Sequence, residues 1–98
     1  MKNIYKIIWS DEALKGLNNI IDYIENRFSE KDVKKFAFLF DEQIRVIQSF
    51  PKSFPLSKKS KNIRKSVVAK LTSVYYSFDG DVISIISIID NRMHQEKH

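Results

Sequence analysis

The chain contains no cysteine and only two histidines among its 98 residues. A disulfide framework and a thiolate metal site are therefore excluded, and two histidines do not make a usual structural zinc site. We expect no cofactor and no metal. The apolar segment near the N-terminus is interrupted at Lys6, so it is too short for a signal peptide or a membrane helix. These features predict one soluble, cytoplasmic domain over residues 1–98, without membrane association.

Acidic residues are missing between Glu42 and Asp79, a segment with eight basic residues. The other nine of the 17 basic residues are outnumbered by the 12 acids, so the net charge of +5 arises in this segment. Such segregation is typical of a surface for an anionic partner, either nucleic acid or an acidic protein segment. A solvated basic loop without function is the alternative. The candidate binding residues in this segment are Lys58, Lys59, Lys61, Arg64, Lys65 and Lys70.

The first half of the chain predicts a strand and two helices. Asn3–Trp9 is rich in residues that favour strands. Apolar residues then recur at spacings of three and four behind Ser10, and again behind Ser29, and both serines suit the N-cap position. The short connection Arg27–Glu30 indicates an antiparallel helical hairpin. Phe50-Pro51 should end the second helix, because the residue before proline disfavours the α conformation.

The second half predicts a polar connection followed by three strands. The connection is Pro51–Asn62, and the strands are Ile63–Val68, Leu71–Phe78 and Asp81–Ile89. Asp79-Gly80 suits a two-residue type I′ turn, which would join the last two strands as a hairpin. The last strand carries six branched apolar residues, so we expect it to be central and covered on both faces.

This order of elements predicts an α+β fold, a two-layer sandwich in which the helical hairpin packs on a mostly antiparallel four-stranded sheet. No helix remains for the opposite face of the sheet, so a binding surface should lie there. We expect it to include some of Arg64, Lys70, Arg92 and one of Tyr75 and Tyr76. Alternation along the strand favours Tyr75, which shares its side with Ser73 and Ser77.

Several short motifs in a fixed order resemble the RelE/ParE toxin superfamily over nearly the whole chain. They are Ile7-Ile8-Trp9-Ser10-Asp11-Glu12-Ala13, Phe50-Pro51, Ile63-Arg64, Val74-Tyr75-Tyr76 and Ile88-Ile89-Asp90-Asn91-Arg92. The resemblance implies the toxin of a bacterial type II toxin–antitoxin pair, a plasmid stabilisation protein held in a hetero-oligomer by its antitoxin. We expect this antitoxin to contribute an acidic amphipathic segment, added to the sheet face or to a sheet edge.

Two activities occur on this superfamily's fold, so the resemblance alone leaves the target open. RelE-like members cleave messenger RNA in the ribosomal A site, and ParE-like members poison DNA gyrase. For RNA cleavage, Arg64 and Arg92 match the family's arginines at the start of the second sheet strand and at the end of the last. Either arginine would hold the scissile phosphate, and His94 would serve as acid or base. The lysines and Tyr75 would bind the nucleic acid.

The C-terminal segment favours the ParE-like reading. RelE-like toxins usually carry a tyrosine or a His-Tyr pair there, whereas no aromatic residue follows Phe78 in this chain. Asp90-Asn91-Arg92 resembles ParE-like members more closely. A RelE-like endoribonuclease is the alternative, and an inactive binding module is a third. Structural roles also remain open, because Arg92 could pair with Asp90 and Arg64 could serve as a sheet-edge charge.

Overall fold

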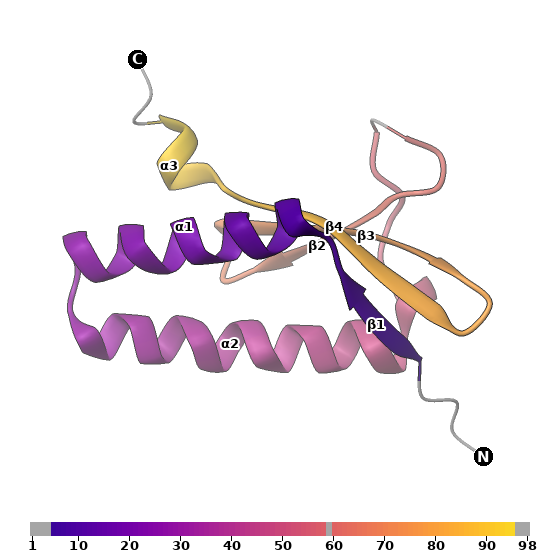
Figure 1. Ribbon diagram of the computed structural model, residues 1–98, viewed down its shortest axis with the longest axis horizontal. Helices are drawn as coiled ribbons and strands as arrows, with labels where there is room; N and C mark the ends of the chain where they lie inside the picture. The colour runs from indigo at the N-terminus through magenta and orange to yellow at the C-terminus, as the bar shows by residue number, and fades with distance from the viewer. Residues whose placement is uncertain (1–4, 59, 96–98) are drawn as a thin grey trace.

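Two long helices cover one face of a four-stranded sheet in the computed structural model, which describes residues 5–58 and 60–95 (Figure 1). The elements are β1 (Lys6–Trp9), α1 (Asp11–Arg27), α2 (Glu30–Ser49), the 3-10 helix η1 (Pro51–Ser53), β2 (Arg64–Val68), β3 (Thr72–Asp79), β4 (Val82–Asp90) and α3 (Asn91–Gln95). The predicted α+β class and element order are confirmed, and α3 is an addition. Asn3 and Ile4 of the predicted first strand lie outside the described residues.

The sheet has the strand order β1-β4-β3-β2. β1 runs parallel to β4, whereas β4 with β3 and β3 with β2 pair antiparallel. The last strand is central, as predicted, and its hairpin with the preceding strand is confirmed. The prediction that it is covered on both faces is wrong, because the helices cover one face only and Ile89 is 40% exposed on the other. Because the first strand pairs with the last, the sheet joins the two ends of the described chain.

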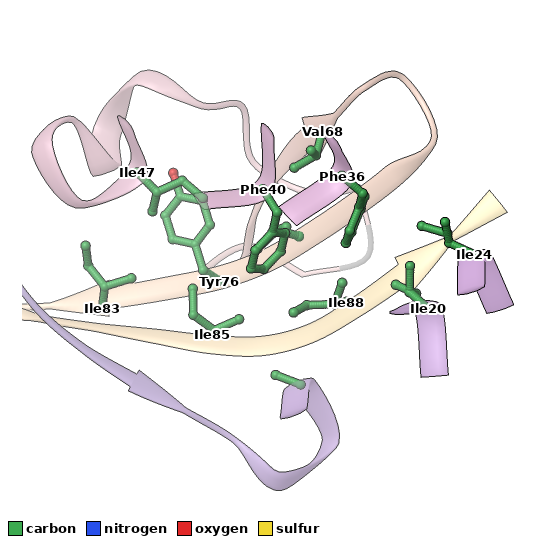
Figure 2. Packing of buried hydrophobic residues seen from close by; sticks show 12 residues of the cluster. Ile20, Ile24, Phe36, Phe40, Ile47, Val68, Tyr76, Ile83, Ile85 and Ile88 are labelled. Carbon is green, nitrogen blue, oxygen red and sulfur yellow. The ribbon is translucent and has the colours of Figure 1, made fainter. Parts of the chain in front are cut away.

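The core lies between the helical hairpin and the sheet. Figure 2 shows Ile83, Ile85 and Ile88 of β4 pointing to the side of the sheet on which Ile47, Phe40 and Phe36 of α2 lie. Each helix begins as predicted: Ser10 accepts a hydrogen bond from the Ala13 N–H, and Ser29 forms a reciprocal capping box with Asp32. The hydrogen bonds from Ser29 lower the pKa of Asp32.

The turn between β3 and β4 differs from the predicted one. Asp79 pairs with Val82, so the two loop residues are Gly80 and Asp81 rather than Asp79 and Gly80. In this turn φ is positive only at Gly80, at 61°. A positive φ at the first central residue alone is the pattern of a type II′ turn, so the predicted type I′ turn is wrong.

The turn between β2 and β3 places two residues other than glycine at positive φ. The Leu71 N–H donates to the Val68 carbonyl over 3.1 Å, and both central residues have positive φ, 51° at Ala69 and 69° at Lys70. A type I′ turn has this pair of positive values and normally uses Asn or Gly. A residue with a Cβ in this conformation costs roughly 1–2 kcal/mol.

Lys70→Gly should therefore raise the free energy of unfolding, by about 1 kcal/mol once the greater freedom of glycine in the unfolded chain is subtracted. Lys70→Ala is the matched control, because it removes the same charge and keeps the Cβ. Urea denaturation of both variants measures the difference. Equal stability of the two variants would show that the positive φ at Lys70 carries no strain.

Close contact between α1 and β4 fixes the helix on the sheet. A Cβ on Gly16 would lie 2.6 Å from the Ile88 carbonyl oxygen, so only glycine allows this approach. Ser10 adds a polar link, because its hydroxyl donates to the Ile86 carbonyl over 2.7 Å while it caps the helix. The two contacts hold the start of α1 against the middle of β4.

The connection between α2 and β2 has more structure than the predicted polar loop. η1 forms directly after α2, and Leu56 then forms an isolated antiparallel bridge with Arg64. The Lys65 N–H donates to the Pro55 carbonyl, and the Ser57 N–H donates to the Ile63 carbonyl. These bonds cover the first half of the outer edge of β2. The remainder of the connection rises on the side of the sheet away from α2 (Figure 1).

Candidate partner-binding site

Three neighbouring cross-strand rows of side chains lie on the sheet face opposite the helices, and we call these rows the open sheet face; a fourth row, Lys6, Val82 and Asp79, follows at the hairpin end. The strand register places these residues on it: Val67, Ser73 and Ile89 in one row, Lys65, Tyr75 and Ser87 in the next, and Ser77, Ser84 and Ile8 in the third. Val67, Ile89 and Ile8 are 45%, 40% and 48% exposed. Tyr75 lies here as predicted, whereas Tyr76 is fully buried on the helix side.

A β-bulge shapes the centre of this face. Tyr75 pairs with Ser87 while Tyr76 pairs with Ile85, so Ile86 is an extra residue in β4. The bulge turns both Ile86 and Ser87 toward the open side, and the Ser10 hydroxyl bonds the Ile86 carbonyl. A depression of about 130 Å³ lies there, lined by Ser57, Ile63, Tyr75, Ile86, Ser87 and Ile89.

The spacing of two serines in the sequence indicates this bulge, although a regular alternation along the strand does not predict it. Ser84 and Ser87 are three residues apart, and a regular strand places residues two apart on the same face. Only an inserted residue lets both serines face the same side. The lining residues Ile63, Ile86 and Ile89 were not among the predicted site residues, because isoleucine in a strand most often indicates core.

Basic residues lie beside the depression. Lys65 is exposed directly across from Tyr75, and Lys58 and Lys61 are exposed in the connection that contributes Ser57 and Ile63 to the lining. Lys59 lies outside the described residues. Lys70 is exposed in the β2–β3 turn, five residues along the chain from Lys65. Lys65 is the only charged residue in the three rows.

Arg64 faces the helix side of the sheet, because it pairs with the buried Tyr76. Its guanidinium donates to the Phe54 carbonyl over 2.6 Å and lies 5.6 Å from the Phe78 ring centre. The Tyr76 hydroxyl donates to the Pro51 carbonyl over 2.6 Å, and burial raises the pKa of Tyr76 to about 12. Arg64 and Tyr76 thus bind the chain just after α2 to the sheet, and Arg64 does not belong to the open sheet face.

Arg92 also lies on the helix side, at the other end of the sheet. Its Nε and Nη2 donate to the two carboxylate oxygens of Asp90 over 3.0 and 2.7 Å, and its guanidinium lies 5.9 Å from the ring centres of both Tyr23 and Phe28. The Asp90 side chain is fully buried and also accepts bonds from the Thr72 hydroxyl and the Arg92 N–H. Of the readings left open for Arg92, the structure shows the pair with Asp90.

The charge on Asp90 stabilises the fold. Burial pushes the pKa of Asp90 up, but the hydrogen bonds from Arg92 and Thr72 together outweigh burial, so the pKa lies below its ordinary value of 3.8. A lowered pKa means that this carboxylate contributes stability above about pH 4 and that the contribution is lost as the pH falls through the folded-state pKa. Hydrogen bonding to Asp90 raises the pKa of Arg92.

A carboxyl NMR titration should therefore place the Asp90 midpoint below 3.8, and the free energy of unfolding should fall as the pH drops through that midpoint. Thr72→Val removes one hydrogen bond to the carboxylate and should move the midpoint upward. A midpoint above 3.8 in the wild-type protein would show that burial outweighs the hydrogen bonds.

The two arginines do not meet in one site. Arg64 pairs with Tyr76, and Asp90, which binds Arg92, pairs with Thr72. Tyr76 and Thr72 are four residues apart on β3, which separates them by about 13 Å along the sheet. The backbone of His94 falls in α3, but its side chain lies outside the described residues. Among the contacts described, two titratable side chains adjoin the Arg92 guanidinium, the ionised Asp90 and Tyr23, and Arg64 pairs with the buried Tyr76.

Neither a metal-ligand cluster nor a membrane-spanning helix occurs in the described residues. No three His, Cys, Asp or Glu side chains in residues 5–58 and 60–95 gather as ligands for a metal ion. Within the same residues, no helix has the length and apolar character needed to cross a membrane.

A match to one family model favours the ParE-like branch of the superfamily. The family model described as ParE toxin of type II toxin–antitoxin system, parDE, matches residues 7–95. The chain belongs to the ParE toxin family. This match confirms the resemblance drawn from the sequence motifs and the preference for ParE-like over RelE-like. It also makes the chain a toxin of a type II toxin–antitoxin module. No curated protein sequence matches the chain significantly.

One solved structure supports the fold of this ParE-family toxin, and a second is a weaker match. A chain of the chromosomal ParDE toxin–antitoxin system from P. aeruginosa superposes with a TM-score of 0.76 at 17% sequence identity, covering 90% of this chain and 97% of that chain. A conserved hypothetical protein from Helicobacter pylori matches with a TM-score of 0.49 at 13% identity, covering 91% of this chain and 97% of that chain. The first of these likenesses supports the two-layer fold.

Proposed function

We propose that this ParE-family toxin inhibits DNA gyrase by binding it, without catalysis of its own, and that a cognate antitoxin neutralises it in a hetero-oligomer. The observation that carries the proposal is that both family arginines already donate hydrogen bonds within the fold. Arg64 donates to a backbone carbonyl and Arg92 is bonded to a buried carboxylate. An RNA-cleaving site needs such cations free to bind the scissile phosphate, close to an acid–base group.

The surface chemistry also supports binding rather than cleavage. The open sheet face presents exposed isoleucine and valine side chains with Lys65 among them and with buried or half-buried serines between them, and its depression is mostly apolar. Apolar side chains with a basic rim suit a protein partner that carries acidic residues. Gyrase and DNA are cytoplasmic in bacteria, so the proposal places the toxin in the cytoplasm.

The test uses the purified toxin with purified gyrase, plasmid DNA and ATP. Linear DNA trapped on gyrase should accumulate with toxin concentration, and preincubation with the protein encoded by the adjacent gene should prevent it. In a translation extract the same toxin should leave messenger RNA intact. Cleavage ends in the ribosomal A site without any effect on gyrase would overturn the proposal in favour of the RelE-like alternative. No effect in either assay would indicate an inactive binding module.

A further inference from the structure

We propose that two copies of this toxin associate through the outer face of α2, with the two helices packed antiparallel across a two-fold axis at Phe38. The contact has an aromatic centre and charged sides, and it leaves the open sheet face of both copies free. It goes beyond the proposed function and does not depend on it, because the residues that form it belong neither to the open sheet face nor to the two arginines.

The centre of this face is an exposed aromatic ring. Phe38 is 64% exposed, the highest fraction among the large apolar side chains that the structure describes. It lies two residues from both Phe36 and Phe40, which are buried, and two residues turn a helix by about 200°. Phe38 therefore points away from the core. Burying such a ring against a partner is favourable, and Ala37 beside it is exposed and small enough for a second helix to approach closely.

Charges of opposite sign lie on the two sides of the ring. Lys35 and Lys34 are three and four residues before Phe38, and Asp41 and Glu42 are three and four residues after it. Residues at these spacings are neighbours of Phe38 on the helix surface, and all four are exposed. The outer face of α2 is thus basic on one side of the ring and acidic on the other.

This order of charges fits a second copy of the same face. In an antiparallel pair with its two-fold axis at Phe38, each residue before the ring meets the residue equally far after it in the other copy. The two rings then meet each other, and the lysines of each copy meet the carboxylates of the other. A parallel pair would set lysine against lysine and carboxylate against carboxylate, so the charges select the antiparallel orientation.

Other classes of partner fit this face less well. Nucleic acid is anionic along its whole length, so Asp41 and Glu42 would repel it, and they would repel an acidic peptide in the same way. Lys31 and Arg45 are the like charges that approach in the antiparallel pair. They lie two turns from the ring, where the crossing angle of packed helices moves the two axes apart.

Sedimentation velocity of the purified toxin tests the dimer. One helix from each copy makes a small interface, and interfaces below about 1,200 Å² are typical of weak, transient complexes. The wild-type protein should therefore pass from monomer to dimer between about 1 and 500 µM. Phe38→Ser should raise the dissociation constant at least about tenfold, because the ring is lost from both copies. Circular dichroism confirms that each variant is folded.

Charge reversal tests the antiparallel pairing. Lys35→Glu sets a carboxylate against Glu42 of the other copy, and Glu42→Lys sets an ammonium group against Lys35, so each variant alone should dimerise at least about tenfold more weakly. An equimolar mixture of the two variants should form heterodimers with wild-type affinity, because both contacts between positions 35 and 42 then join opposite charges. Lys65→Glu makes the same charge change on the open sheet face and should dimerise as the wild-type protein does.

Three results would overturn the inference. They are a wild-type toxin that stays monomeric through this range, a dimer that Phe38→Ser leaves unchanged, and a mixture of the charge-reversed variants that stays monomeric. A monomeric wild-type toxin whose inhibition of gyrase is weakened by Phe38→Ser would assign this face to a different protein partner. The gyrase assay and the sedimentation experiment have separate readouts, so failure of the proposed function is distinguishable from failure of the dimer.

Discussion

Arg92→Ala should lower the free energy of unfolding by about 3 kcal/mol, because it leaves the buried carboxylate of Asp90 without its cation. Thr72 and one backbone N–H still bond the carboxylate, but neither carries a charge. The variant also loses the contacts of the guanidinium with Tyr23 and Phe28. Urea denaturation followed by circular dichroism measures the loss.

Two controls separate the buried pair from an ordinary ion pair. Arg45→Ala removes an ion pair with Asp41 in which both side chains are mostly exposed, and it should change stability by less than about 0.5 kcal/mol. The double variant Asp90→Ala with Arg92→Ala should lose less free energy of unfolding than the sum of the losses in the two single variants, because neither charge is left without its partner. A loss below about 1 kcal/mol in Arg92→Ala would contradict the structural role.

This prediction affects how toxicity data on arginine variants are read. Loss of growth inhibition in Arg92→Ala is expected from lost stability alone, so it would not identify Arg92 as a contact to gyrase or RNA. Toxicity is better compared between variants of the open sheet face, where the substituted residues are exposed. Arg64→Ala has the same weakness, since Arg64 binds the chain after α2 to the sheet.

Gly16→Ala should lower the free energy of unfolding by about 2 kcal/mol, although alanine is the better helix former by roughly 1 kcal/mol. The added Cβ would meet the Ile88 carbonyl oxygen at 2.6 Å, and that oxygen belongs to an interior strand that cannot easily move. α1 must therefore shift away from the sheet, which loosens the packing of Ala13 and Ile20. Thermal and urea denaturation should show the loss together.

Lys15→Ala is the matched control, because Lys15 is exposed on the same helix one residue away. It should leave stability within about 0.5 kcal/mol of the wild-type value. If Gly16→Ala proved more stable than the wild-type protein, helix propensity would outweigh the close contact, and the packing of α1 on Ile88 would have to be looser than described.

Hydrophobic periodicity was sufficient to predict the layers of this fold, whereas the residue types in the turns were not sufficient to predict the turn conformations. Apolar spacing placed both helices, and Ser10 and Ser29 marked their starts correctly. The Asp-Gly pair suggested a type I′ turn, but the register moved the loop by one residue to Gly80-Asp81. The turn with two positive φ values uses Ala69 and Lys70, which no local sequence rule selects. Sheet pairing on both sides imposes that conformation.

The candidate site was predicted only in part, for a physical reason. Alternation correctly separated Tyr75 from Tyr76, and the charge distribution located the lysines beside the open face. From the sequence alone, Arg64 and Arg92 could be assigned to the open sheet face as well as Tyr75 and the lysines, because an arginine at a strand end can face either side of the sheet. Only the pairing of Arg64 with the buried Tyr76 and the approach of Arg92 to Asp90 show that both turn toward the helices.

The parallel pairing of β1 with β4 also dictates when the protein can fold during its synthesis. Lys6 pairs with Val82, which the ribosome adds 76 residues later. At about 5–20 residues per second, this interval lasts roughly 4–15 s, and through it the apolar sides of the helical hairpin have no completed sheet to cover them. The nascent toxin therefore cannot present its open sheet face until β4 has emerged, because that strand lies between β1 and β3 in the sheet.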